Sequence, residues 1–334
     1  MKILSVAIAA YNVEKYLDKC LTSFADERLC DGLEVLVVND GSRDRTPEIA
    51  EDYVRRYPAI FRLINKENGG HGSAVNAGIE QATGKYFRVV DGDDWVNTDD
   101  LVRLIDRMRE LDTDLVVDQR TTVHMVTGEE VFLPLPKGTP FEQTVEFLDH
   151  NGPDICDFYH MHTVSAKLSL LHEQGIRLRE HIFYVDYEYV LKTTASSRTV
   201  TFLDLDVYRY LIGNSAQSVD SQNYVRRISH HEQVVRELLR YATESGFEGR
   251  MKAYVDHRVA LILNTHFTIA LIYNKDRKQG AAQAKAFRAF LQKEYPAFYR
   301  LSARRYRQAR ILHALGVDYD RLQMLMGRGG RKAG

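Results

Sequence analysis

Short runs of apolar residues alternate with helix-like segments over the first 120 residues of the chain. Each apolar run is continuous, as in strands whose two faces are both buried. In the segments between them, apolar positions recur every three or four residues, which is typical of amphipathic helices. Strands that alternate with helices predict βαβ units and a mostly parallel, doubly wound α/β sheet. The predicted strands are Ile3–Ala10, Glu34–Asn39, Phe61–Ile64, Tyr86–Asp91 and Asp114–Asp118, and the predicted helices are Val13–Ala25, Thr46–Tyr57, Ser73–Ala82 and Asp99–Leu111.

Two local signals refine these elements. A β-hairpin is predicted where the runs Thr121–Val126 and Val131–Leu133 flank a Thr127-Gly128 turn. The segment Thr46-Pro47-Glu48 predicts a helix start, with the Thr46 hydroxyl as N-cap, proline in the first turn and an acid at the positive end of the helix dipole.

The organisation changes in the second half of the chain. Residues 140–210 mix helices and short strands, whereas from Ser221 onward almost every segment has helical spacing. We therefore expect an α/β domain over residues 1–218 and an all-helical domain over residues 219–334. The end of the second domain is basic, because residues 300–334 carry nine Lys or Arg side chains and two acidic ones.

Composition limits the class of protein. Of the 334 residues, 44% are hydrophobic and 27% are charged, which describes an ordinary soluble globular protein. The net charge of −1 argues against a basic nucleic-acid-binding protein, so no nucleic-acid partner is expected. The three cysteines form no C-x-x-C pair, which indicates a reducing, cytoplasmic compartment. The runs Ile3–Ala10 and Val259–Tyr273 are too short for a membrane span, and no signal peptide is predicted.

Acidic residues follow two of the predicted strands, where ligands bind in an open parallel sheet. Asp40 belongs either to a simple Asp-Gly turn or to a site where its carboxylate accepts a hydrogen bond from a base such as uracil. Asp91 and Asp93 can converge on one site, because alternate residues of an extended segment point the same way, and Gly92 allows a ligand close to the backbone. Carboxylate oxygens suit Mg²⁺ or Mn²⁺ shared with phosphates. The alternative is acidic capping of the helix that follows.

Three other sequence features bear on the kind of ligand or catalysis. The turn after the first strand contains neither G-x-G-x-x-G nor a P-loop, which argues against a dinucleotide-binding enzyme or a P-loop NTPase. The glycine-rich segment Asn68–Gly72 opens a helix, so it either presents backbone N–H groups to an anion or is simply a flexible loop. His160 and His162 share a strand face without a third ligand nearby, which favours structural histidines over a metal site.

Together these segments resemble family 2 glycosyltransferases of the GT-A fold. The resemblance covers roughly residues 3–100 with specific motifs and extends more weakly to about residue 220, whereas the helical C-terminal third matches no motif. The resembling motifs are Tyr11-Asn12, Val37-Val38-Asn39-Asp40-Gly41-Ser42, Asn68 to Ile79, and Gly84 to Trp95 with its D-x-D element Asp91-Gly92-Asp93.

The resemblance implies a set of donor-site residues by position. Asp40 would contact the uracil of a UDP-sugar, with Tyr11 and Glu14 near the base. Asp93 would ligate a divalent cation, Mn²⁺ or Mg²⁺, that bridges the diphosphate, and Asp91 would contact the ribose or take part in the metal site. The other residues expected to bind the nucleotide sugar are Gly72, Asn76 and Gly92.

The resemblance also implies a general base, for which Asp186 is the candidate in an aromatic-rich segment. Glu188 is a neighbouring competitor, and Asp186 could instead cap the helix that follows it. The chain departs from the family pattern in three places, of which Ala10, at a position often taken by proline, is the mildest. Val185 replaces a glutamate beside the base, and Val75 stands where many members have an arginine, with His71 as a candidate replacement for that cation. The segments Tyr208–Tyr210 and Gln217-Ser218 resemble those that close such sites, near donor phosphates or acceptor.

These expectations define an inverting, metal-dependent glycosyltransferase. It would move a hexose or N-acetylhexosamine from a UDP-sugar to a hydroxyl of a glycan or lipid-linked acceptor, in synthesis of a cell-surface polysaccharide. The alternatives are a sugar nucleotidyltransferase and a non-catalytic nucleotide-sugar-binding scaffold. The basic helix Arg304–Arg310 is either a solvated face or a surface that docks on anionic lipid at the inner face of the membrane.

Overall fold

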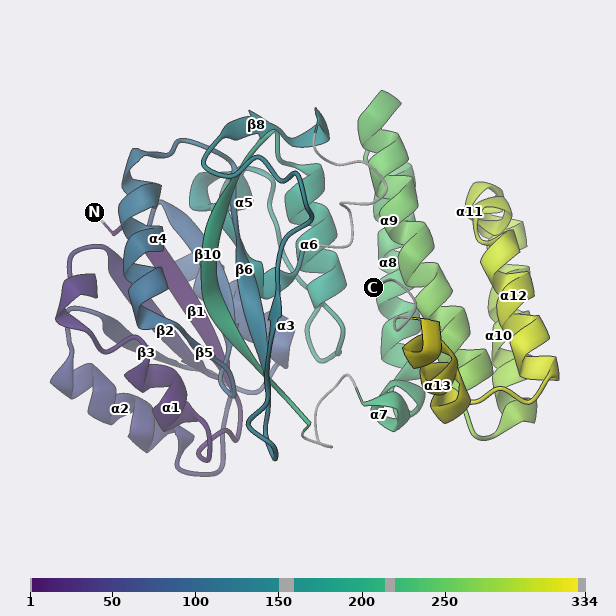
Figure 1. Ribbon diagram of the computed structural model, residues 1–334, viewed down its shortest axis with the longest axis horizontal. Helices are drawn as coiled ribbons and strands as arrows, with labels where there is room; N and C mark the ends of the chain where they lie inside the picture. The colour runs from purple at the N-terminus through teal and green to yellow at the C-terminus, as the bar shows by residue number, and fades with distance from the viewer. Residues whose placement is uncertain (1, 150–158, 214–219, 330–334) are drawn as a thin grey trace. The chain divides into compact units, whose positions relative to one another are not determined.

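The computed structural model describes residues 2–149, 159–213 and 220–329. It divides into two compact units, Met1–Asn214 and Ser215–Gly334 (Figure 1). The first unit is built around a β-sheet, whereas the described part of the second consists of helices. The predicted domain boundary between residues 218 and 219 lies outside the described residues.

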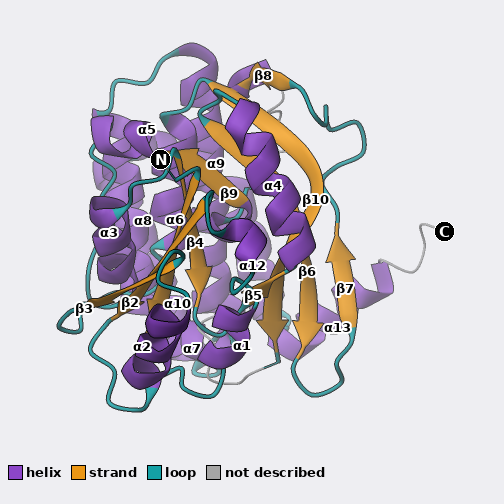
Figure 2. Cartoon of the chain, turned by 90° about the vertical axis from the view of Figure 1, so that its left-hand side faces the viewer, coloured by secondary structure: helices purple, strands orange, loops and turns teal. Residues whose placement is uncertain are grey.

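A ten-stranded sheet forms the centre of the first unit, in the order β3-β2-β1-β4-β9-β6-β10-β5, with β7 paired to β6 and β8 paired to β10 (Figures 1 and 2). The four longest pairings are parallel, β1–β2, β1–β4, β2–β3 and β6–β10, and shorter antiparallel pairings add the other strands. The strands are β1 (Leu4–Ala10), β2 (Leu33–Asn39), β3 (Phe61–Asn65), β4 (Tyr86–Asp91), β5 (Trp95–Val96), β6 (Leu115–His124), β7 (Glu130–Leu133), β8 (Thr144–Glu146), β9 (Val164–Lys167) and β10 (Thr199–Ile212).

Helices cover both faces of the sheet, as a doubly wound fold requires (Figure 2). Helices α1, α2 and α4 share a core with the side chains of Leu4, Val6 and Ile8, whereas α3 packs on the opposite face against Leu36 and Val38. The helices of this unit are α1 (Leu17–Thr22), η1 (Glu27–Leu29), α2 (Thr46–Arg56), α3 (His71–Gln81), α4 (Thr98–Glu110), η2 (Phe147–Asp149), η4 (Met161–Thr163), α5 (Leu168–Glu173) and α6 (Asp186–Ala195).

The carboxyl ends of β1, β2 and β4 meet at one edge of the sheet. Ala10 lies opposite Asn39, and Ala9 lies opposite Asp91. The N–H of Asp40 extends the ladder by donating to the carbonyl of Ala10 at 2.9 Å. The segments after these three strands therefore share one edge, as the sequence predicted.

Every predicted strand and helix of the first 120 residues is present, and two details differ. Helix α2 begins at Thr46, but the Thr46 hydroxyl is not its N-cap: it accepts the N–H of Val13 at 2.9 Å, and the Asp44 carboxylate accepts the N–H of Thr46 at 3.0 Å. The last predicted strand continues through the first arm of the hairpin, so β6 runs unbroken over Leu115–His124 and pairs with β7.

The described part of the second unit contains helices and no strand. Apolar side chains of α8 and α9 are buried in its core, among them Val234, Leu238, Val259 and Leu263. No helix in the described ranges is both long and apolar enough to cross a membrane. The helices are α7 (Ser221–Arg226), α8 (Ile228–Glu244), α9 (Gly249–Thr268), a π-helical segment η5 (Ile269–Tyr273), α10 (Arg277–Glu294), α11 (Pro296–Leu301), α12 (Ala303–Ala314) and α13 (Tyr319–Gly329).

Candidate active site

The loop after β1 is tied to the loop after β2 at the carboxyl edge of the sheet. Asn12 has a left-handed backbone (φ 53°), and its Oδ1 accepts the N–H of Arg43 at 2.8 Å. Glu14 closes the same pair of loops, because its Oε2 accepts the N–H of Arg45 at 2.9 Å. Next to this turn, Tyr11 keeps 47% of its surface exposed. Two predicted site residues, Tyr11 and Glu14, therefore lie on one rim.

The Asp40 carboxylate is buried and organises the glycine-rich loop. Its Oδ1 accepts from Lys66 Nζ at 2.7 Å and from the N–H of Gly69 at 2.9 Å. Its Oδ2 accepts from Asn68 Nδ2 at 3.0 Å and from the N–H of Gly70 at 2.8 Å. Each oxygen therefore already accepts two hydrogen bonds, which fills its ordinary capacity. Contact between Asp40 and a base stays a prediction, and it requires one of these donors to leave.

Three carboxylates gather after β4. Asp91, Asp93 and Asp94 each place an oxygen within 4.8 Å of the others. Asp94 is committed to the protein, because it accepts from the Tyr208 hydroxyl and from the N–H of Leu211 at 2.7 Å. Asp93 differs: within the described ranges, no other residue donates a hydrogen bond to its carboxylate or forms an ion pair with it. Asp94 thus anchors the loop to β10, and Asp93 keeps its oxygens for a ligand.

Two imidazoles flank Asp91. His71 Nε2 lies 2.9 Å from Asp91 Oδ1, and His162 Nε2 lies 3.5 Å from Oδ2. His71 is the first residue of α3, and the His162 ring stacks on Tyr208 with centroids 4.8 Å apart. The sequence had singled out His71, but it gave no sign that His162 reaches Asp91. That contact depends on β9 returning between β4 and β6.

Burial and mutual repulsion set the charge of this cluster. Burial raises the pKa of Asp93 to about 6, and the neighbouring Asp91 carboxylate adds to the effect. Burial also acts to raise the pKa of Asp91, but the imidazoles of His162 and His71 outweigh it and hold that pKa well below its usual range. The cluster therefore favours a positive partner. Carboxylate oxygens of Asp91 and Asp93 are the donors that Mg²⁺ and Mn²⁺ prefer, so the donor set fits a divalent cation.

Gly72 and Asn76 hold the loop that leads to Asp186. A Cβ on Gly72 would lie only 2.0 Å from the carbonyl oxygen of Arg179. The Asn76 side chain pairs with the backbone of Leu178 in both directions: its Nδ2 donates to the carbonyl at 2.9 Å, and its Oδ1 accepts the N–H at 2.8 Å. Both residues therefore hold the loop in place, and their predicted contacts with a nucleotide sugar stay predictions. Gly92 also packs closely, because a Cβ there would lie 3.1 Å from the carbonyl oxygen of Ala9.

Asp186 is the first residue of α6 and is only partly buried. Val185 occupies the N-cap, so Asp186 stands inside the first turn rather than at the cap itself. Burial raises the pKa of Asp186 to about 6, the His71 imidazole opposes this rise, and the Asp91 carboxylate adds to it. The charge of Asp186 therefore interacts with His71 and Asp91. A carboxylate with a pKa close to neutral is suited to accept a proton.

Two other candidates have structural partners. Glu188 is fully buried, with Arg179 Nε at 3.5 Å and Lys192 Nζ at 3.3 Å from its oxygens, so it is not a competing base. Tyr208 is fully buried and donates to Asp94, so its side chain supports the acidic loop. A role of the Tyr208–Tyr210 segment at the donor phosphates or the acceptor stays a prediction. The segment Gln217-Ser218 lies outside the described residues.

The sequence matches the family "Glycosyl transferase family 2" over residues 5–173, which is half of the chain. The chain therefore belongs to this family of glycosyltransferases. It is 31% identical over 221 residues to the uncharacterized glycosyltransferase EpsJ of Bacillus subtilis, a match that spans 62% of this chain and 60% of EpsJ. It is 33% identical over 108 residues to a chondroitin synthase of Escherichia coli, covering 32% of this chain and 16% of that enzyme. The matched parts are thus less than two thirds of these relatives.

Solved structures share the fold over most of the chain. S. aureus TarS (residues 1–349), determined in complex with UDP-GlcNAc, superposes with a TM-score of 0.64 at 22% identity, covering 96% of this chain and 93% of that one. The mannosyltransferase PcManGT of Pyrobaculum calidifontis, in complex with GDP-Man and Mn²⁺, superposes with a TM-score of 0.51 at 16% identity, covering 93% of this chain and 86% of that one. The predicted GT-A-like α/β fold with a helical C-terminal region is therefore confirmed.

Proposed function

We propose that the protein is a metal-dependent, inverting glycosyltransferase that uses a UDP-sugar. It transfers a hexose or N-acetylhexosamine to a hydroxyl of a glycan or lipid-linked acceptor, in the synthesis of a cell-surface polysaccharide. The observation that carries the proposal is the uncommitted Asp93 carboxylate beside Asp91, together with Asp186, whose charge interacts with that of Asp91. The complex of TarS with UDP-GlcNAc and the similarity to a chondroitin synthase support the choice of donor and pathway.

In this proposal, the rim formed by the first two loops receives the nucleotide. The exposed ring of Tyr11 stacks on the uracil, and Asp40 accepts the uracil N–H. Because both Asp40 oxygens are already fully hydrogen bonded, the Lys66 ammonium gives way when the base binds. Lys66 is the candidate to move because it sits on a flexible side chain, whereas Gly69 and Gly70 donate from the backbone.

Asp93 and Asp91 would hold the divalent cation, Mn²⁺ or Mg²⁺, whereas Asp94 is already committed to Tyr208 and Leu211. When bound, such a cation stabilises the negative charge that develops on the departing diphosphate. The complex of PcManGT with GDP-Man and Mn²⁺ supports a metal requirement in this fold. The two imidazoles keep Asp91 ionised, so this ligand is ready to bind a cation at neutral pH.

Asp186 serves as the general base. Its carboxylate takes the proton from the acceptor hydroxyl, the hydroxyl oxygen forms a bond to the anomeric carbon, and the bond from that carbon to the UDP oxygen breaks. One such displacement inverts the anomeric centre. Its pKa near 6 leaves Asp186 mostly ionised at pH 7 yet basic enough to accept a proton.

A basic surface in the helical unit supports docking to anionic lipid, which would bring the enzyme to a lipid-linked acceptor. Beside its exposed arginines, the region of α12 leaves Ile311 53% and Leu315 70% exposed. Each arginine near an anionic surface contributes about 1 kcal/mol, and apolar side chains can enter the interface. The exposed arginines of α12 are Arg304, Arg305, Arg307 and Arg310. Flotation with anionic phosphatidylglycerol vesicles should show salt-sensitive binding. Docking would be contradicted if the protein did not bind these vesicles, or if it bound neutral phosphatidylcholine vesicles equally well.

The proposed reaction is tested by replacing the base. Asp186→Asn should lower UDP release from UDP-GlcNAc or another bound UDP-sugar by about 100-fold or more, the usual contribution of a general base. UDP affinity should stay unchanged, and the exposed Asp106→Asn variant should behave like the unaltered protein. Activity should also fall as the pH drops below about 6. Full activity of Asp186→Asn would contradict the assignment of Asp186 as the general base. Release of pyrophosphate instead of UDP would indicate a sugar nucleotidyltransferase. No turnover of any UDP-sugar by the unaltered protein would favour a non-catalytic scaffold.

A further inference from the structure

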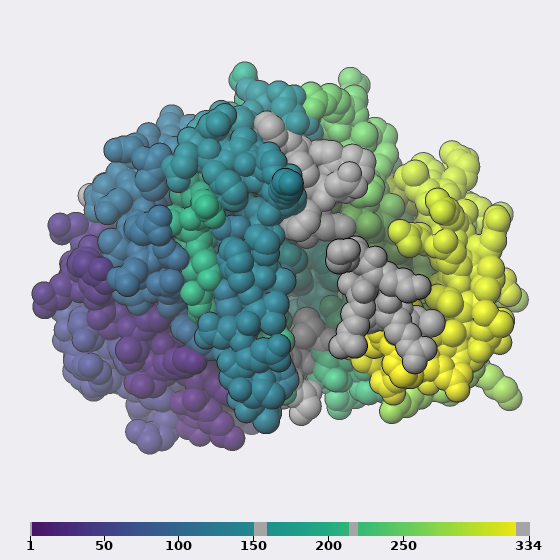
Figure 3. All heavy atoms as spheres, in the orientation of Figure 1, coloured from purple at the N-terminus to yellow at the C-terminus, as the bar shows by residue number. Residues whose placement is uncertain are grey.

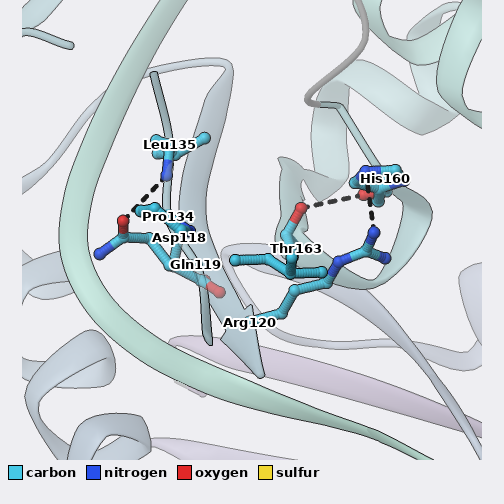
Figure 4. Close-up of a pocket in the computed structure, with 8 residues that line it drawn as sticks. Asp118, Gln119, Arg120, Pro134, Leu135, His160 and Thr163 are labelled. Carbon is cyan, nitrogen blue, oxygen red and sulfur yellow. Dashed lines mark hydrogen bonds between the residues drawn. The ribbon is translucent and has the colours of Figure 1, made fainter. Parts of the chain in front are cut away.

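A cavity of about 200 Å³ opens on the first unit beside β6 (Figure 4). Ligand sites for whole small molecules usually exceed about 300 Å³, so this space suits one chemical group of a larger ligand. One wall of the cavity is formed by β6 and the segment after β7, and the opposite wall by the residues around His160 (Figure 4). Its lining residues are Asp118, Gln119, Arg120, Leu133, Pro134, Leu135, His160 and Thr163.

Arg120 supplies a positive charge to this cavity. Its Nη2 lies 3.1 Å from His160 Nε2, and its guanidinium lies 5.9 Å from the ring centroid of Tyr210. A guanidinium carries five N–H donors, so the contact with His160 leaves others for a ligand. Burial lowers the pKa of Arg120, which reflects the cost of keeping this charge partly out of water.

The carboxylate in the lining does not neutralise Arg120. Asp118 is fully buried and forms an ion pair with Arg88, whose Nε donates to Ser165 at 2.8 Å. Among the described residues, no carboxylate forms an ion pair with Arg120. The cavity therefore carries an excess positive charge that an acidic group would match, through the paired N–H bonds that arginine makes to carboxylates and phosphates.

Apolar side chains border the same cavity. Leu133, Pro134 and Leu135 line it, and Val131, which is 46% exposed, lies on the same face of β7 as Leu133. The β6–β7 hairpin forms part of the molecular surface, as its teal atoms show in Figure 3. Exposed apolar residues on adjoining positions indicate a contact with an apolar ligand or partner.

The cavity adjoins the candidate active site through two aromatic rings. Tyr210 contacts Arg120, and the Tyr210 ring stacks on His162 with centroids 6.2 Å apart. His162 in turn lies 3.5 Å from Asp91. A group bound at Arg120 is therefore separated from Asp91 by the side chains of Tyr210 and His162.

We propose that the Arg120 cavity binds an acidic group of the acceptor, a phosphate or carboxylate, while β7 contacts an adjoining apolar part of the same molecule. This inference rests on the proposed function and narrows the acceptor to an amphiphilic acid, such as a lipid phosphate that carries the hydroxyl to be glycosylated. The acceptor would then enter from the β6–β7 side, with its acidic group fixed near the transferred sugar.

The test uses three probes that separate the acid from the apolar part: octyl phosphate below its micelle concentration, neutral octyl glucoside, and inorganic phosphate. Octyl phosphate should bind the full-length protein more tightly than either other probe. Arg120→Gln should weaken its binding about tenfold or more, as expected for loss of a charge-assisted pair. Arg103→Gln, at an exposed arginine of α4, is the matched control and should bind octyl phosphate normally.

A second variant makes the apolar part falsifiable without disturbing the core. Leu133→Ser, at a position that lines the cavity and is 38% exposed, should weaken the binding of octyl phosphate but leave the binding of inorganic phosphate unchanged. Equal binding of octyl glucoside and octyl phosphate, or unchanged affinity in Arg120→Gln, would overturn the acid site. Inorganic phosphate binding as tightly as octyl phosphate would overturn the amphiphilic acceptor. UDP titrations keep the two proposals apart: if the unaltered protein binds UDP normally but does not bind octyl phosphate, only this inference is contradicted.

Discussion

Replacing Gly72 with alanine should uncouple donor binding from catalysis. Gly72 opens the first turn of α3, and a Cβ at this position would lie 2.0 Å from the Arg179 carbonyl oxygen. Ordinary contacts of a Cβ begin at 3.4 Å, and the clashing atom belongs to the backbone rather than to a flexible side chain. The segment around Arg179 must therefore move, and it leads within seven residues to Asp186.

The size of the effect follows from that displacement. The loop has to shift by roughly 1 Å or more, and misplacing a catalytic group by about 1 Å costs on the order of 100-fold in rate. That loss corresponds to about 2.7 kcal/mol of transition-state stabilisation. Asp40, Asp91 and Asp93 lie on other segments, so the affinity for UDP should remain.

The assay measures UDP affinity by calorimetry and turnover as UDP released from a UDP-sugar. Gly32→Ala is the matched control, because its new Cβ is also crowded, 2.5 Å from Ile105 Cγ2, but far along the chain from the base loop. The control should lose stability without a specific loss of turnover. Normal turnover of a folded Gly72→Ala variant would contradict this prediction. So would a loss of UDP affinity as large as the loss of turnover.

Two predictions concern stability. Arg88→Met should destabilise the first unit by about 3–5 kcal/mol, because it leaves the buried Asp118 carboxylate without its partner; denaturant unfolding measures this, and a loss below about 1 kcal/mol would contradict it. The second concerns His231 and His266, buried with their Nδ1 atoms 3.3 Å apart. Burial lowers both pKa values, that of His266 to about 3, so stability should fall as pH drops below 6.5, by about 1.4 kcal/mol per pH unit for each histidine. Thermal melting followed by far-UV circular dichroism at pH 7 and pH 5 tests this, and the fluorescence of Trp95 reports separately on unfolding of the first unit. A helical unfolding transition that does not change with pH would contradict the prediction.

The fold of the first unit was largely predictable because its signals are local. Continuous apolar runs predicted β1 to β4 and the first part of β6, but not the two-residue strand β5. The placement of Asp40, Asp91 and Asp93 follows from strand ends that share one edge of a parallel sheet. The sequence also predicted that Asp91 and Asp93 converge, but they do so across a turn after β4, closed by the N–H of Asp94 on the carbonyl of Asp91, rather than on an extended segment.

Contacts between distant segments were not predictable in this way. Asn76 pairs with Leu178 across 102 residues, so an amide that looked available for a ligand both donates to and accepts from a distant backbone segment. His162 reaches Asp91 only because β9 inserts beside β4. The Thr46 hydroxyl likewise serves Val13 in another loop rather than its own helix. In each case a side chain has several partners of suitable chemistry, and only the tertiary fold decides among them.

The central claim is that Asp91 and Asp93 bind UDP through a divalent cation, and calorimetry tests it most directly. UDP should be titrated with and without Mn²⁺ into the unaltered protein and into Asp93→Asn, with Asp106→Asn as the control and GDP, CDP and ADP as competing nucleotides. We expect UDP-selective binding that requires Mn²⁺, is lost in Asp93→Asn and persists in Asp106→Asn. UDP binding that is indifferent to Mn²⁺ and to Asp93, or no nucleotide binding at all, would contradict it.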